Sequence, residues 1–179
     1  MSTRLNFGLI GAGRIGRVHA ENLTHRISNV SLLAVSDLFL DAAQTCAKDF
    51  QIAHAHQDHR AILDNPEIDA VVICSSTDTH TRFITEAAQA GKHIFCEKPI
   101  ALDLVKIDAA LESVKKAGVK LQIGFNRRFD ANFRHLHETI KAGGIGDVNL
   151  LQITSRDPAP PCGRRRARTP RQRKERRNS

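Results

Sequence analysis

An apolar segment, residues 5–10, runs directly into a turn with the pattern G-x-G-x-x-G. Between a strand and a helix, such a turn is suited to hold a pyrophosphate. The first glycine permits the tight turn, the second lets the backbone approach the phosphates, and the third lets the helix lie close to the sheet. A glycine turn with a purely structural role is the alternative. The residues assigned to dinucleotide binding here are Gly11, Gly13, Arg14, Ile15 and Gly16.

A second apolar segment, residues 31–36, ends in Asp37, which lies 21 residues after Gly16. This is about where the motif places the carboxylate that binds the adenosine ribose. A carboxylate accepts hydrogen bonds from a 2′-hydroxyl and repels a 2′-phosphate, and no arginine is nearby in the sequence, since Leu38 follows. The sequence therefore predicts NAD rather than NADP. The alternative is that Asp37 only caps the helix expected near Asp41.

Strand-like and helix-like segments alternate along the chain. Strands are expected at about residues 5–10, 31–36, 52–55, 70–75, 93–96 and 119–125. Helices are expected at about residues 14–26, 41–50, 59–63, 80–90 and 103–117, with N-caps at Thr79 and Asp103 and C-caps at Gly91 and Gly118. This order predicts an α/β fold, a doubly wound parallel sheet of the Rossmann type, whose ligands bind at the carboxyl ends of the strands.

Polar residues follow three of these strands at the edge where a nicotinamide or a substrate would lie. They are Ser75, Thr77 and His80 after the strand at 70–75, Glu97 and Lys98 after the strand at 93–96, and Asn126 and Arg127 after the last strand. Lys98 is the most suggestive, because an ammonium beside the nicotinamide can stabilise a developing alkoxide. The alternative for Lys98 is an ordinary surface lysine in a loop.

The net charge of +8 belongs to the end of the chain. Residues 162–179 contain eight Arg, one Lys and one Glu, whereas residues 1–161 carry equal numbers of acidic and basic side chains. The last eighteen residues also lack Val, Ile, Leu and Phe, so we expect a disordered basic tail at 162–179. Nucleic acid is therefore an unlikely partner except through this tail, where binding would weaken steeply with salt.

Other features exclude whole classes of protein. Arginines interrupt any signal-peptide pattern near the start, and no apolar run could span a bilayer, so a cytoplasmic protein without membrane contact is expected. The four cysteines form no C-x-x-C pair, which favours reduced thiols. His54, His56 and His59 have no further clear ligand beside them, so no metal site is expected.

Three stretches together resemble the glucose–fructose oxidoreductase/inositol dehydrogenase/rhizopine catabolism (Gfo/Idh/MocA) family. They are the glycine turn at 11–16, the run A-G-K-H-I-F-C-E-K-P at 90–99 and G-F-N-R-R-F-D at 124–130. The ending at 154–161 is similar to that of the family's inositol 2-dehydrogenases. The resemblance covers residues 5–161 and implies oxidation of a polyol, myo-inositol to its 2-ketone, by hydride transfer to NAD⁺.

The resemblance also implies roles for individual residues. In the family, the lysine that matches Lys98 contacts the reacting hydroxyl, and the acid that matches Glu97 lies near the nicotinamide ribose. Matches to Ser75, Thr77 and His80 line the cofactor. Matches to Asn126, Arg127 and Asp157 lie on the substrate side.

One departure from the family pattern is serious. Family members supply an Asp-x-x-x-His pair from a second domain, and no Asp of this chain has a His four residues later. We expect an NAD-binding domain at 1–124 and an incomplete start of an α+β domain at 125–161, with a helix at 129–142 and a strand at 148–154. The interface of the family's homo-oligomer would be largely missing. A reading-frame shift near residue 161 explains the abrupt change, and the rival is a non-catalytic NAD-binding protein whose tail binds nucleic acid.

Overall fold

A computed structural model describes residues 4–154 of the chain. The chain divides into two compact units after Arg134. The domain boundaries expected after residues 124 and 161 stay predictions. Asp157 and the basic segment at 162–179 lie outside the described residues.

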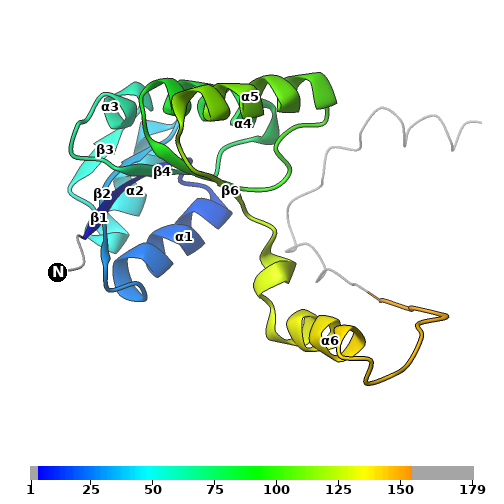
Figure 1. The fold of residues 1–179 in the computed structure, drawn as a ribbon. Helices are drawn as coiled ribbons and strands as arrows, with labels where there is room; N and C mark the ends of the chain where they lie inside the picture. Colours follow the sequence, from blue (N-terminus) through cyan, green and yellow to red (C-terminus); the bar gives the residue numbers. More distant parts are fainter. Residues whose placement is uncertain (1–3, 155–179) are drawn as a thin grey trace, which may run out of the picture. The chain divides into compact units, whose positions relative to one another are not determined.

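The first unit is built around a six-stranded parallel sheet with the strand order β3-β2-β1-β4-β5-β6 (Figure 1). The strands are β1 (Leu5–Ile10), β2 (Val30–Ser36), β3 (His54–His56), β4 (Ala70–Ile73), β5 (His93–Cys96) and β6 (Leu121–Ile123). The helices are α1 (Arg14–His25), α2 (Leu40–Phe50), α3 (Arg60–Leu63), α4 (Thr77–Gln89) and α5 (Leu104–Ala117). The doubly wound fold predicted from the alternation is confirmed.

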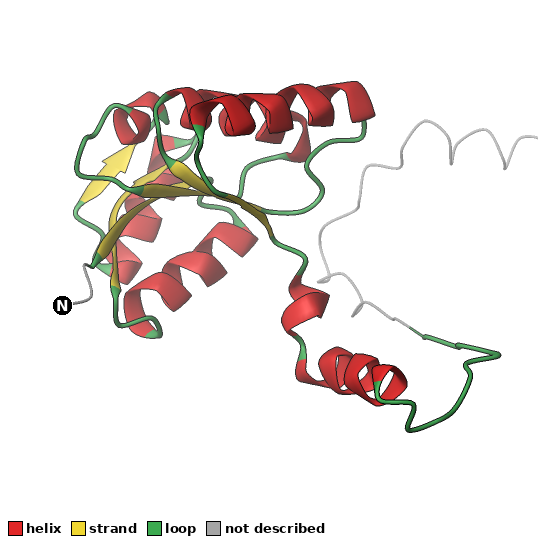
Figure 2. Ribbon diagram, viewed as in Figure 1, coloured by secondary structure: helices red, strands yellow, loops and turns green. Residues whose placement is uncertain are grey.

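Helices cover both faces of this sheet (Figure 2). On one face, Ala20 of α1 and Cys46 of α2 pack with alternate residues of β1 and β2 such as Leu9 and Val35. On the other face, α3, α4 and α5 pack on Ile73 and its neighbours. Because side chains alternate along a strand and both faces are covered, the central strands read as continuous apolar runs. The chain order reverses between β1 and β4, which places the carboxyl ends of these two strands at the switch point where such sheets bind ligands.

The helix ends follow the sequence with two corrections, both in α4, whose C-cap is Ala90 rather than Gly91. Asp103 caps α5 by accepting a hydrogen bond from Val105 N at 3.0 Å, and Gly118 ends that helix with φ of +67°. Thr79 is not the cap of α4: the helix starts at Thr77, three residues before the expected start, and its N-cap is Ser76. The Thr79 hydroxyl lies within the first turn, where it donates to Ser76 O, and a side chain bonded inside a helix cannot also cap it.

The region after β6 contains a 3-10 turn, η1 (Asn126–Phe129), and helix α6 (Ala131–Lys141). The strand expected at 148–154 is absent, and the described residues there have no regular secondary structure. Its apolar side chains are exposed, Leu150 at 85%. A strand needs a neighbour to satisfy its backbone, and the described residues offer this segment none. No helix in the described range, 4–154, is long and apolar enough to cross a membrane.

Lys92, the residue before β5, is a buried lysine without a carboxylate partner among residues 4–154. Its ammonium donates to Asn65 O at 2.7 Å and to Ile68 O at 2.8 Å, and the residue is only 7% exposed. These two bonds join the loop before β4 to the neighbouring strand. Hydrogen bonds from a charged donor to buried acceptors contribute about 1.5–3 kcal/mol each when one partner is removed.

We expect Lys92→Met to lower the free energy of unfolding by about 2–4 kcal/mol, because methionine fills the space but leaves Ile68 O without a partner and Asn65 O with only its 3.3 Å bond from Ile68 N. Urea unfolding followed by circular dichroism measures the loss. Lys48→Met, at an exposed position of α2, is the matched control and should change stability by less than about 0.5 kcal/mol. Equal losses in the two variants would contradict this role of Lys92.

Candidate functional site

The glycine turn between β1 and α1 has a backbone that only glycines permit. Gly11 has φ of +102°, and a Cβ there would lie 2.7 Å from the backbone of Cys74. A Cβ on Gly16 would lie 1.9 Å from Gly11 O, so α1 starts in direct contact with the turn. Gly13 differs from both, because a Cβ on it would meet nothing within 4 Å. The protein therefore needs Gly11 and Gly16 for packing, whereas Gly13 faces open space.

The N-terminus of α1 is free to receive an anion. No side chain caps the helix at Gly13, and its first turn contains no acidic residue. The first N–H groups of a helix, here those after Gly13, have no partner within the helix and carry its positive end. Arg14 and Ile15, the first two helical residues, are exposed. This end of α1 therefore fits a phosphate group.

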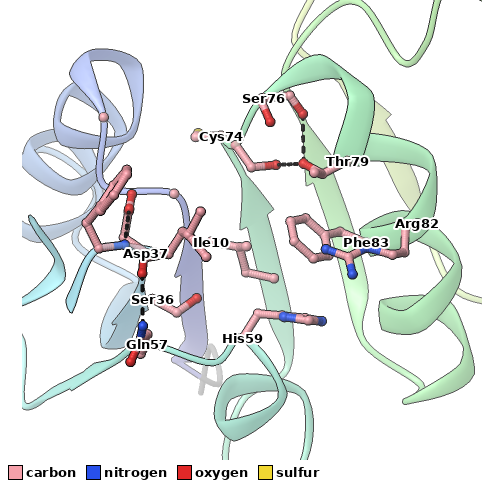
Figure 3. Close-up of a pocket in the computed structure, with 15 residues that line it drawn as sticks. Ile10, Ser36, Asp37, Gln57, His59, Cys74, Ser76, Thr79, Arg82 and Phe83 are labelled. Carbon is pink, nitrogen blue, oxygen red and sulfur yellow. Dashed lines mark hydrogen bonds between the residues drawn. The ribbon is translucent and has the colours of Figure 1, made fainter.

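A pocket of about 500 Å³ opens beside the turn, over the carboxyl ends of β1, β2 and β4 (Figure 3). Four of the predicted cofactor residues line it: Gly11, Gly13, Asp37 and Ser75. Arg14, Ile15, Gly16, Thr77, His80, Glu97 and Lys98 are not among its lining residues. The pocket thus gathers two glycines of the turn, the predicted ribose ligand Asp37, and Ser75 from the edge predicted for the nicotinamide; the remaining candidates lie outside its walls.

Asp37 joins the end of β2 to the glycine turn. One carboxylate oxygen accepts from Ala12 N at 2.8 Å and the other from Phe39 N at 3.0 Å (Figure 3 draws the second bond). The alternative that Asp37 caps α2 is wrong, because Phe39 holds the N-cap position. Each carboxylate oxygen can accept a second hydrogen bond, so the group keeps capacity for hydroxyl donors of a ligand.

Ser36 is a pocket residue that the sequence analysis did not single out. Its hydroxyl is the one buried side-chain polar group within the described residues that has no hydrogen-bond partner. The residue is 1% exposed and lines the pocket at the end of β2 (Figure 3). A buried hydroxyl without a partner is unfavourable, so this orphan group favours a polar ligand in the pocket. No local pattern marks Ser36, which reads as the last residue of an apolar strand.

Helix α4 brings an arginine into the pocket, which the neighbourhood of Asp37 in the sequence does not reveal. Arg82 stacks on the ring of Phe83, with its guanidinium carbon 4.6 Å from the ring centroid, and lies 4.0 Å from Glu86. The same Glu86 bonds His59, whose ring packs on Phe83 with the ring centroids 4.4 Å apart. No arginine lies near Asp37 in the sequence, but Arg82 lines the same pocket. Its guanidinium lies 4.0 Å from the Glu86 carboxylate.

A second group of polar residues surrounds the turn after β5. Lys98 is exposed, and the structure gives its ammonium no hydrogen bond or ion pair to any described residue. Glu97 accepts from His19 Nε2 of α1 at 2.8 Å. His80 is not in the pocket wall: its ring is buried, with Nδ1 2.8 Å from Pro99 O and Nε2 3.1 Å from Ser75 O. His19 was missed because its partner is far away in the sequence.

The remaining candidates are placed by local structure. Thr77 is the first residue of α4 and is half-buried. Asn126 and Arg127 lie in η1 and are exposed, and the Arg127 guanidinium stacks on Phe133 at 4.9 Å. In the part of the chain described, no group of His, Cys, Asp or Glu side chains could hold a metal ion.

The described cysteines are all free and buried. Burial raises the pKa of Cys96 to about 12, and the nearby Glu97 carboxylate adds to the shift. Burial also raises the pKa of Cys74, again with help from Glu97, and that of Cys46. The neutral form is favoured in each case, so these thiols are structural rather than nucleophilic.

We expect Cys96 in the folded protein to react with iodoacetamide at pH 8 about a thousandfold more slowly than an unperturbed thiol, because its thiolate fraction is lower by about that factor. The folded pKa is raised, so labelling should accelerate as the pH rises. A Cys162→Ser chain, analysed by peptide mass spectrometry with and without urea, measures the rate. Labelling as fast without urea as with it would contradict this expectation.

Comparison with known proteins identifies the family. Residues 5–125 match the model of an oxidoreductase family with an NAD-binding Rossmann fold (Gfo/Idh/MocA). The chain belongs to this family. Among its relatives are the myo-inositol 2-dehydrogenase of Thermotoga maritima and the inositol 2-dehydrogenase of Rhizobium meliloti, each 46% identical over 88% of this chain and 47% of the relative. The chain thus spans about half the length of the curated relatives it matches.

Solved structures of the Gfo/Idh/MocA family agree with the fold. A scyllo-inositol dehydrogenase from Lactobacillus casei, solved with NAD(H) and scyllo-inositol, superimposes with a TM-score of 0.77. It is 32% identical and is matched over 81% of this chain and 43% of its own. A probable dehydrogenase from Thermotoga maritima gives a TM-score of 0.76 at 44% identity, over 79% of this chain and 42% of that one.

Proposed function

We propose that this chain binds NAD(H) with its pyrophosphate on the N-terminus of α1 and its adenosine ribose at Asp37. The observation that carries the proposal is the pocket, which joins an uncapped helix end, open space at Gly13 and an unpaired buried hydroxyl on Ser36. The uncapped helix end favours an anion, and the open space at Gly13 lets a ligand approach the backbone closely. The unpaired hydroxyl favours a polar ligand group.

The individual roles follow from position. Gly11, Gly13, Arg14, Ile15 and Gly16 provide the turn and the N–H groups that hold the pyrophosphate. Asp37 binds the ribose hydroxyls and selects NAD over NADP, since its carboxylate accepts from a 2′-hydroxyl and repels a 2′-phosphate. Ser75 lies in the pocket wall, while Thr77, His80 and Glu97 support the nicotinamide side.

For the whole protein we propose oxidation of a polyol of the inositol class. NAD⁺, when bound, supplies the hydride acceptor. Lys98 donates a hydrogen bond to the reacting hydroxyl and stabilises the charge that develops on its oxygen. Asn126, Arg127 and Asp157 are the residues that we assign to the substrate side.

The proton acceptor is the part that this chain does not provide. The 179 residues contain no Asp-x-x-x-His pair, so Lys98 has no partner base of that kind. We therefore propose that the chain binds NAD(H) and turns over myo-inositol little or not at all.

Calorimetric titration of the 179-residue chain with NADH and with NADPH tests this function. We expect a saturable one-to-one isotherm for NADH and at least tenfold weaker binding of NADPH, a difference of about 1.4 kcal/mol. Myo-inositol with NAD⁺ should give no NADH above background. Absence of NADH binding would refute the proposed cofactor site, and robust turnover would refute the assignment of a missing base.

A further inference from the structure

The ammonium of Lys98 makes no hydrogen bond or ion pair with the described residues, so no contact fixes its position. Lys98 is exposed, and its backbone N–H donates to Glu97 Oε2 at 3.3 Å. A lysine side chain has several rotatable bonds and loses rotamer entropy when it is fixed. The direction in which Lys98 points is therefore set by the backbone on which it stands, the turn formed by residues 97–99.

Both ends of this turn are bound by imidazole rings from other elements. At one end, His19 of α1 donates from Nε2 to Glu97 Oε1 at 2.8 Å, with its ring packed on Phe95. At the other end, His80 of α4 lies with Nδ1 2.8 Å from Pro99 O. Carbonyl oxygens only accept hydrogen bonds, so the His80 ring is the donor.

Each imidazole also belongs to an element of the proposed cofactor site. His19 lies three residues after Gly16, on the helix whose N-terminus fits the pyrophosphate. The second nitrogen of His80 faces Ser75 O at 3.1 Å, and Ser75 lines the pocket. The two rings thus connect the turn that carries Lys98 to the two sides of the dinucleotide cradle.

We propose that His19 and His80 are positioning residues that clamp residues 97–99 from both ends and couple the placement of Lys98 to the binding of the dinucleotide. The coupling rests on the proposed function, whereas the clamp itself does not. The low exposure of the two rings supports the clamp: His80 is buried, at 1% exposed, and the His19 side chain is half-buried, at 22%. Contacts held in a water-poor environment fix geometry better than exposed ones.

The test follows Lys98 itself by NMR. Reductive methylation of the full chain with ¹³C-formaldehyde keeps the charge of each lysine, and Lys98→Arg identifies the Lys98 signal by its loss. Four variants are compared with the unmodified sequence: His19→Leu, His80→Leu, the donor-retaining His19→Gln, and the control His25→Leu. His25 lies on the same helix but is exposed and does not contact the turn.

Without NADH, we expect His19→Leu and His80→Leu to move or broaden the Lys98 signal, His19→Gln to restore most of its position, and His25→Leu to leave it unchanged. On saturation with NADH, the Lys98 shift should fall by at least half in both leucine variants, and in His19→Leu the dissociation constant should stay within about threefold of the original.

An unchanged Lys98 signal in His19→Leu and His80→Leu would overturn the clamp. If the unmodified chain binds no NADH, the proposed function fails, and the spectra without NADH still decide the clamp. If His80→Leu does not fold, the two His19 variants decide. A Lys98 signal that is moved or broadened in His19→Leu and largely restored in His19→Gln supports the clamp. The same Lys98 signal in both variants overturns it.

Discussion

Replacing Gly13 with alanine should leave the protein folded and remove most of its affinity for NADH. The backbone at Gly13, with φ of −69° and ψ of −172°, suits an alanine, and its Cβ would meet no atom within 4 Å. The added methyl group enters the open space that the proposed pyrophosphate would occupy. We expect the dissociation constant for NADH to rise at least about a hundredfold, equivalent to about 2.7 kcal/mol, as measured by fluorescence titration.

Gly16→Ala is the counterpart that separates binding from folding. A Cβ there would lie 1.9 Å from a backbone oxygen, so α1 would have to move. The expected loss is about 3 kcal/mol in the free energy of unfolding, whereas Gly13→Ala should stay within about 0.5 kcal/mol of the original chain. Gln44→Ala, at an exposed position of α2, should change neither quantity. Unweakened NADH binding by a folded Gly13→Ala chain would contradict the placement of the phosphates.

Asp37→Asn should reduce the preference for NADH over NADPH by about a hundredfold. The amide keeps an acceptor oxygen for one of the two backbone donors, Ala12 N or Phe39 N, but loses the charge that repels a 2′-phosphate. We expect NADH to bind about tenfold more weakly and NADPH about tenfold more tightly, each change being about 1.4 kcal/mol. Parallel titrations with both coenzymes measure the ratio.

Salt dependence provides the control for this variant. Repulsion between a carboxylate and a phosphate is screened by ions, so added salt should weaken the discrimination of the original chain and have little effect on that of Asp37→Asn. Asp49→Asn, which removes an exposed carboxylate paired with Arg17 at 2.6 Å, matches the charge change away from the pocket. An unaltered NADH/NADPH ratio in Asp37→Asn would show that another group selects the coenzyme.

The first unit could be predicted from the sequence because each of its elements carries its own signal. The core strands are apolar runs, and local residues such as Gly118 and Asp103 end or begin a helix by their own conformation or hydrogen bonds. The segment at 148–154 shows the limit of such reasoning. Its pattern suits a strand, but a strand forms only where a partner lies beside it, and pairing is not encoded in the segment alone.

The same distinction applies to the site. The glycine turn and Asp37 were found because both belong to one β–α–β unit with fixed spacing. The sequence does not single out Arg82, Ser36 or His19, because their place in the site depends on which strands the crossovers bring together. The strand order places β4 beside β1, so α4 reaches the pocket from residues about 70 positions away along the chain.

The most direct test is an NADH titration of the uniformly ¹⁵N-labelled 179-residue chain, read by the backbone amide signals. A pyrophosphate on the N-terminus of α1 should shift the amides of Gly13, Arg14 and Ile15 most strongly and along one saturable curve, with the Asp37 amide following the same curve. Gly13→Ala should abolish these shifts without disturbing the remaining spectrum. Shifts confined to other parts of the chain, or none up to about 1 mM NADH, a concentration that corresponds to only about 4 kcal/mol of binding energy, would contradict the assignment of this turn as the dinucleotide site.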